Sequence, residues 1–127
     1  MKVQFRAIRE EDRRFLQKLY RSTRWEELAP VPWSTEQKED FLKWQFEAQH
    51  THYQKYFPDA TFDIILYKSK PIGRLYLDRR ADEFRIVDIA LLPEYRNKGI
   101  GSQLLQNIMA DAERSGLLAC SKSSEGI

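Results

Sequence analysis

The segment from residue 86 to residue 112 constrains the fold more than any other part of this chain. An apolar run over residues 86–92 predicts a buried strand, which Pro93 ends. A short basic turn follows and closes with Gly99 and Gly101. From Ile100 onward apolar side chains recur at helical spacing, which predicts an amphipathic helix. The chain therefore passes from a strand, through a tight turn, directly into a helix.

This turn has the chemistry of an anion site. The first N–H groups of a helix lack intrahelical partners and lie at the positive end of the helix dipole, so they favour a bound phosphate. Arg96 and Lys98 add mobile positive charge, and the two glycines let a ligand approach the backbone without a Cβ in the way. We predict a site for a diphosphate-bearing cofactor, formed by Arg96, Asn97, Lys98, Gly99, Ile100, Gly101 and Ser102.

Two other phosphate-binding motifs do not fit this turn. The phosphate-binding loop of nucleotide hydrolases needs four residues between its glycines and a Gly-Lys-Ser/Thr ending, which the chain lacks. A dinucleotide fingerprint needs a third glycine where this chain has Leu104. The diphosphate site predicted here is therefore of another kind, and a strand-to-helix joint that binds nothing is the alternative.

The order Leu-Leu-Pro-Glu-Tyr-Arg-x-x-Gly-x-Gly resembles the acetyl-CoA signature of the GNAT superfamily of N-acetyltransferases. The resemblance implies an α+β, GNAT-like fold with a mostly antiparallel central sheet flanked by helices. It also implies that the turn wraps the CoA pyrophosphate and that main-chain groups of Ala90, Leu91 and Leu92 bind the pantetheine arm. The co-substrate is then acetyl-CoA, and no metal is expected.

The remaining elements agree with this fold. We expect a first strand at residues 3–7, helices that begin near residues 10 and 34, strands over 62–67, 72–77 and 84–92, and a last strand from Leu117. Ser34 or Thr35 is expected to cap the second helix, and Gly116 to end the third. Residues 1–127 are expected to form one domain that lacks the family's usual C-terminal helix and strand, with a flexible tail at about 121–127. A homodimer that covers the incomplete sheet edge is the expected assembly.

The resemblance implies direct transfer of the acetyl group to a primary amine of a small molecule or protein. Family members often use a carboxylate on or before the fourth strand as the base, and Glu83 and Asp88 are the candidates. Asp88 within an apolar run has a structural alternative, a bond to Arg85, Arg74 or a helix end. No residue matches the family's general acid. A non-catalytic acyl-CoA-binding or interaction module is therefore the alternative function.

The acceptor side of the family's site usually comes from the first two helices, and here that region is rich in aromatic residues. Most of them are expected to lie in the core, and the sequence does not identify the acceptor. The aromatic residues are Trp25, Trp33, Phe41, Trp44, Phe46, Tyr53, Tyr56 and Phe57.

Composition narrows the remaining choices. The net charge of +2 is too small to indicate a nucleic-acid partner. The single cysteine excludes an internal disulfide and favours the cytoplasm, and no apolar run is long enough to cross a membrane. His50 and His52 are two residues apart, which puts them on different faces of a helix and argues against a metal site.

Overall fold

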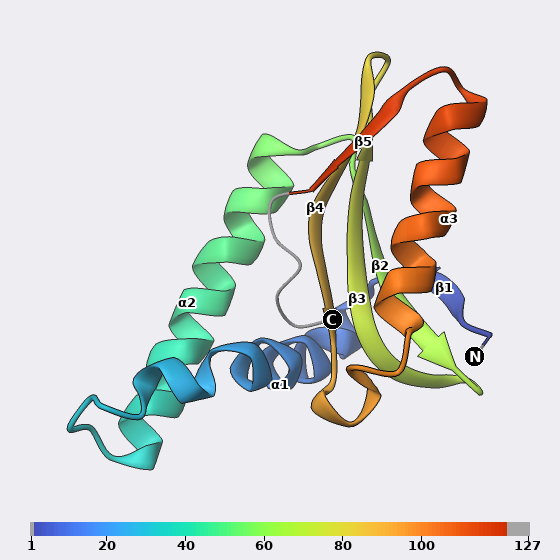
Figure 1. The fold of residues 1–127 in the computed structure, drawn as a ribbon. Helices are drawn as coiled ribbons and strands as arrows, with labels where there is room; N and C mark the ends of the chain where they lie inside the picture. The colour runs from blue at the N-terminus through green and yellow to red at the C-terminus, as the bar shows by residue number, and fades with distance from the viewer. Residues whose placement is uncertain (1, 122–127) are drawn as a thin grey trace. The chain divides into compact units, whose positions relative to one another are not determined.

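The computed structural model describes residues 2–121 (Figure 1). Its contacts divide the chain into two compact units, Met1–Ile8 with Asp59–Ile127 and Arg9–Pro58. The prediction of a single domain stays a prediction. The predicted tail falls almost entirely on residues 122–127, outside the described residues, whereas Ser121 belongs to a strand.

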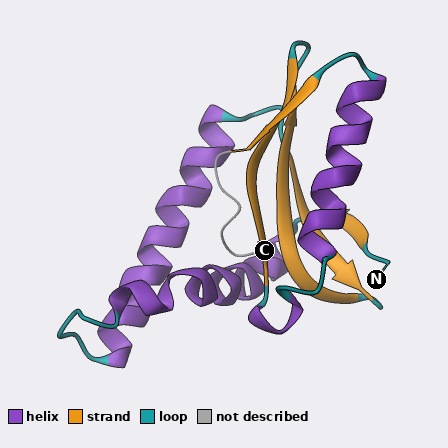
Figure 2. Ribbon diagram, viewed as in Figure 1, coloured by secondary structure: helices purple, strands orange, loops and turns teal. Residues whose placement is uncertain are grey.

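The first unit is built on a five-stranded sheet. Its strands are β1 (Gln4–Ala7), β2 (Thr61–Tyr67), β3 (Lys70–Arg79), β4 (Glu83–Leu91) and β5 (Leu118–Ser121), and they lie in that order across the sheet. All neighbours are antiparallel except β4 and β5, which are parallel. Helix α3 (Ile100–Arg114) crosses over from β4 to β5 and runs along the sheet (Figure 2). The predicted α+β fold with a mostly antiparallel central sheet is confirmed.

The core of this unit lies between one face of the sheet and α3. Leu75, Leu77, Ile86, Ile89 and Leu91 supply the sheet side, and Ile100, Leu104, Ile108 and Ala112 form the apolar stripe of α3. The stripe follows the helical spacing that predicted the helix. Gly116, at φ 74°, ends α3, and the Leu117 N–H donates to Ala112 O at 2.8 Å. The predicted end of this helix is therefore confirmed.

The β2–β3 hairpin is longer than predicted. Its turn is only Lys68 and Ser69, both in the left-handed region at φ 49° and 65°. Two consecutive residues in that region match the two-residue turns whose twist suits a hairpin. β3 therefore begins two residues before the predicted Ile72, and it extends past Leu77 to Arg79. The sequence does not predict so short a turn, because neither of its positions is glycine or asparagine.

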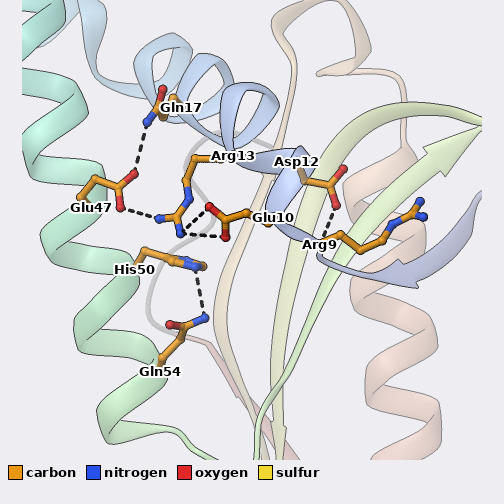
Figure 3. Close-up of polar contacts among 8 residues, drawn as sticks. All are labelled: Arg9, Glu10, Asp12, Arg13, Gln17, Glu47, His50 and Gln54. Atoms are coloured by element: carbon orange, nitrogen blue, oxygen red, sulfur yellow. Dashed lines mark hydrogen bonds and ion pairs between the residues drawn. The ribbon is translucent and has the colours of Figure 1, made fainter.

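The second unit contains two helices. A short 3₁₀ turn at Glu10–Asp12 leads into α1 (Arg13–Arg24), a second one covers Trp25–Leu28, and α2 spans Thr35–Tyr56. Ser34 caps α2 in a reciprocal capping box with Gln37, which settles the predicted choice between Ser34 and Thr35. The Glu47 carboxylate joins the helices by accepting hydrogen bonds from Arg13 and, at 3.2 Å, from Gln17 (Figure 3).

The expectation that most aromatic residues of this region lie in the core is wrong, because only Phe46 and Phe57 of the eight are buried. Trp33, Trp44 and Tyr56 are 43%, 66% and 59% exposed, and the other three are half-buried. Trp44 lies two positions from both Leu42 and Phe46, which are buried, so it is on another face of α2. No helix within residues 2–121 has the length and apolar character needed to cross a membrane.

Candidate functional site

The strand-to-helix turn has two residues in the left-handed backbone region. After a 3₁₀ turn at Pro93–Tyr95, Asn97 has φ 60° and Gly99 has φ 84°, and α3 begins at Ile100. Gly99 is the N-cap, so the cap residue has no side chain that could accept hydrogen bonds from the first N–H groups of α3. A Cβ built on Gly99 would meet nothing within 4 Å. The turn therefore presents the N-terminus of a helix beside open space.

Arg96 makes a contact that the sequence does not predict. Its Nε donates to the carbonyl oxygen of Leu91 at 2.9 Å, and the side chain is half-buried. This bond ties the turn to the end of β4, and the binding of a phosphate by Arg96 stays a prediction. Lys98 is exposed and remains the mobile cation of the turn, while the Ile100 side chain lies in the core.

The edge of β4 that faces β5 is paired over only part of its length. Residues 118–121 of β5 pair with Glu83 to Ile86, and the last of these pairs is Ile86 with Ser121. Within residues 2–121, no strand pairs with residues 87–91 on that side. Within the described part of the chain, the N–H groups that residues 87–91 direct to that side therefore have no strand partner.

The pairing of β4 with β3 shows which amides face that edge. The Leu92 N–H donates to Ile72 O at 2.8 Å, and Leu91 lies opposite Gly73 in the register. Because antiparallel residues alternate in direction, Ala90 and Leu92 direct their N–H groups to β3, whereas Ile89 and Leu91 direct theirs away. Of the three predicted amides only that of Leu91 faces the open edge. Ile89 was missed by the sequence reasoning, although alternation along a strand is a signal that could have found it.

Asp88 is bound to Arg74 on the neighbouring strand. The Arg74 Nη2 lies 2.7 Å from Asp88 Oδ2, and Nε lies 3.3 Å from Oδ1, so the contact is forked. The Arg74 side chain is 4% exposed and that of Asp88 17%. The Arg74 guanidinium also lies 4.9 Å from the centre of the Tyr76 ring. The structural alternative for Asp88 is therefore present, with Arg74 as the partner.

Glu83 lies at the opposite end of β4 from the turn. Its carboxylate accepts a hydrogen bond from Arg85 Nη2 at 2.9 Å. At about 3.3 Å per residue, Glu83 is about 26 Å along the strand from Leu91, whereas Asp88 is about 10 Å from it. The structure thus does not bring Glu83 together with the strand-to-helix turn. Of the two predicted carboxylates, that of Asp88 is the nearer to this turn.

The structure thus has a mostly antiparallel sheet in which β4 leads through a short turn into a helix with a glycine N-cap, and this is the arrangement that the sequence resemblance implied. The Acetyltransferase (GNAT) family model matches residues 12–124. The chain belongs to the GNAT acetyltransferase family. This family transfers acyl groups from acetyl-CoA.

Solved structures show the same fold. PaiA N-acetyltransferase from Thermoplasma acidophilum, solved in complex with coenzyme A, is 23% identical, with 94% of this chain and 77% of that chain covered at a TM-score of 0.61. A Pyrococcus furiosus protein is 21% identical, with 97% and 83% covered and a TM-score of 0.61. A GNAT family acetyltransferase from Staphylococcus aureus is 21% identical, with 99% and 89% covered and a TM-score of 0.53. Among curated proteins, none matches this chain.

Proposed function

We propose that this protein transfers the acetyl group of acetyl-CoA to a primary amine by direct attack. One observation carries the proposal: within residues 2–121 one edge of β4 has no strand partner at residues 87–91, and the short turn after β4 ends at the N-terminus of α3, where Gly99 is the cap. This arrangement offers hydrogen-bond donors for an extended amide-containing arm at one end and for a diphosphate at the other. The CoA complex of the Thermoplasma relative is consistent with that ligand.

The binding roles follow from the geometry of the turn and of β4. The main-chain N–H groups of residues 99–102 bind the pyrophosphate, with the Lys98 ammonium beside them as a mobile cation. The Ile89 and Leu91 N–H groups, which point away from β3, bind the pantetheine arm and the thioester carbonyl. Arg96 acts indirectly, because its bond to Leu91 O holds the turn against the strand.

The chemistry needs no covalent enzyme intermediate. The amine nitrogen attacks the thioester carbonyl carbon, a C–N bond forms, the C–S bond breaks, and CoA leaves as a thiolate. A main-chain N–H at the open edge stabilises the negative charge that develops on the carbonyl oxygen. A primary ammonium has a pKa near 10 and must first lose a proton. We assign the proton acceptor, acting through water, to Asp88, because Glu83 is far from the open edge.

Two measurements on the purified protein test this function. Calorimetry with CoA measures binding, and thiol release from acetyl-CoA with a panel of primary amines measures turnover. Binding together with amine-dependent thiol release supports the transferase. Binding without release with any amine would favour the non-catalytic acyl-CoA-binding module. If CoA does not bind, both functions are wrong.

Asp88 needs a separate test, because it also contacts Arg74. Asp88→Asn should lower kcat, while CoA affinity stays within a factor of two. A variant that keeps the wild-type kcat would contradict the assignment of the proton acceptor. Glu83→Gln is the matched control and should leave kcat unchanged.

The expected dimer and the cytoplasmic location remain predictions. Sedimentation of the full chain at high concentration tests the first, since a monomer under those conditions would contradict it. The location needs a tagged protein followed in cells.

A further inference from the structure

A groove between α1 and α2, within the second unit, is strongly cationic. It has a volume of about 390 Å³ and is lined by Arg14, Gln17, Lys18, Arg21, Glu39, Leu42 and Lys43. The residues from α1 are spaced by three and four positions and therefore share one face of that helix. Four cationic side chains against one carboxylate leave a local charge of +3, which exceeds the net charge of +2 of the whole chain.

The carboxylates near this groove are already bound. Glu39 Oε1 lies 3.1 Å from Arg21 Nη2, across the two helices. Glu47 accepts from Arg13 and Gln17 (Figure 3). Within residues 2–121, no carboxylate lies within 4.0 Å of the charged groups of Arg14, Lys18 or Lys43, and all three side chains are exposed. Three cations of the groove are thus available to an anion from outside.

The size and lining of the groove indicate the kind of anion. A volume near 390 Å³ lies at the small end of the range of about 300–1,000 Å³ that is typical of small-molecule sites. The buried Leu42 provides an apolar floor. Arg14 offers a planar fork of donors, and the two lysines act as point charges, a combination that suits phosphate oxygens. Three available cations match a ligand with more than one negative charge.

We propose that the α1–α2 groove binds a small organic phosphate that carries at least two negative charges. This site does not depend on the acetyl-CoA site proposed above, which is built entirely from the first unit. Its binding residues are Arg14, Lys18 and Lys43, and Arg21 is held by Glu39 at the same groove.

The test uses inorganic pyrophosphate as the probe in calorimetric titrations of the full chain. The double variant Lys18→Gln/Lys43→Gln should lower pyrophosphate affinity at least tenfold. The control Lys38→Gln/Lys55→Gln removes the same charge from the same unit, outside the groove, and should change affinity less than twofold. All four lysines are on helices, so circular dichroism verifies that each variant is folded.

The strand-to-helix turn also offers N–H donors to pyrophosphate, and Lys98→Gln tests binding at that turn. This variant should leave the affinity of the groove for pyrophosphate unchanged. The proposal is overturned by any of three results. The first is no pyrophosphate binding to the wild-type protein. The second is an equal loss in the groove and control variants, which indicates non-specific charge. The third is a loss that occurs only with Lys98→Gln, which places the binding at the turn.

Discussion

Arg74 on β3 and Asp88 on β4 form a forked ion pair across the sheet, with Arg74 Nη2 at 2.7 Å from Asp88 Oδ2 and Nε at 3.3 Å from Oδ1. The guanidinium is almost completely buried, at 4% exposure. Such a pair costs desolvation energy to form, but the loss of one partner leaves an uncompensated buried charge. The pair therefore makes β4 sensitive to any change at Asp88.

We predict that Asp88→Leu destabilises the protein by about 3 kcal/mol, because it leaves the Arg74 guanidinium buried without its carboxylate. The double variant Arg74→Met/Asp88→Leu should recover most of this loss. Urea unfolding of the wild type, Asp88→Leu, Arg74→Met and the double variant gives the coupling energy. If the two single substitutions have additive effects on the free energy of unfolding, the ion pair contributes little to stability.

Gly99→Ala and Gly116→Ala form a matched pair. Both glycines have positive φ, 84° and 74°, and a Cβ at either would meet nothing within 4 Å. Each substitution should lower the free energy of unfolding by about 1 kcal/mol through backbone strain alone. Only Gly99→Ala should also weaken CoA binding, since only Gly99 is at the turn. Calorimetry compares the two, and equal CoA affinities would place the pyrophosphate elsewhere.

Gly73 on β3 has no room for a side chain beside β4. A Cβ on it would lie 2.3 Å from Ala90 O and 2.8 Å from Leu91 Cδ2. Because one of these atoms is backbone, the strands themselves must move, and Gly73→Ala should cost about 3 kcal/mol or more. Thermal unfolding, with Gly116→Ala as the variant with open space, measures this. If Gly73→Ala melts at a temperature no lower than that of Gly116→Ala, the close contact between Gly73 and β4 is contradicted.

Asp63 on β2 gives a prediction about pH. Burial raises the pKa of this carboxyl above its ordinary value of 3.8, although Arg79 partly opposes the rise. The unfolded chain then binds fewer protons than the folded protein between these two pKa values, so stability falls as pH rises through that window. Asp63→Asn should stabilise the protein near neutral pH, by less than about 1 kcal/mol because the site is only half-buried.

The gain from Asp63→Asn should disappear near pH 3, where the aspartate is protonated in both states. Urea unfolding at the two pH values checks this, with Asp82→Asn at an exposed turn as the control. A gain of the same size at both pH values would mean that ionisation of Asp63 is not the cause.

Much of the fold could be predicted because its strongest signals are local. The apolar run of β4, the stripe on α3, the Ser34 cap and Gly116 each depend on neighbouring residues, and each was found. The hairpin turn at Lys68 and Ser69 was not, since neither residue type is typical of the left-handed region. The exposure of Trp44 also escaped prediction, because it depends on which face of α2 meets its neighbours.

The site was predictable in its backbone and less so in its side chains. A turn with two basic residues and two glycines at the start of a helix predicts an anion site whatever surrounds it. The partner of Asp88 depends on strand register, which brings Arg74 to the carboxylate from 14 positions earlier in the chain. The role of Arg96 depends on the Leu91 carbonyl pointing away from β3, and thus on the same register.

The bond between Arg96 Nε and Leu91 O has one more consequence. It fixes the spacing between the helix N-terminus and the last outward-facing amide of β4 before any ligand arrives. A cofactor analogue with a pantetheine arm shortened by one β-alanine unit would reach either the N-terminus of α3 or the Leu91 amide, but not both. We therefore predict that the free protein already selects its cofactor by length.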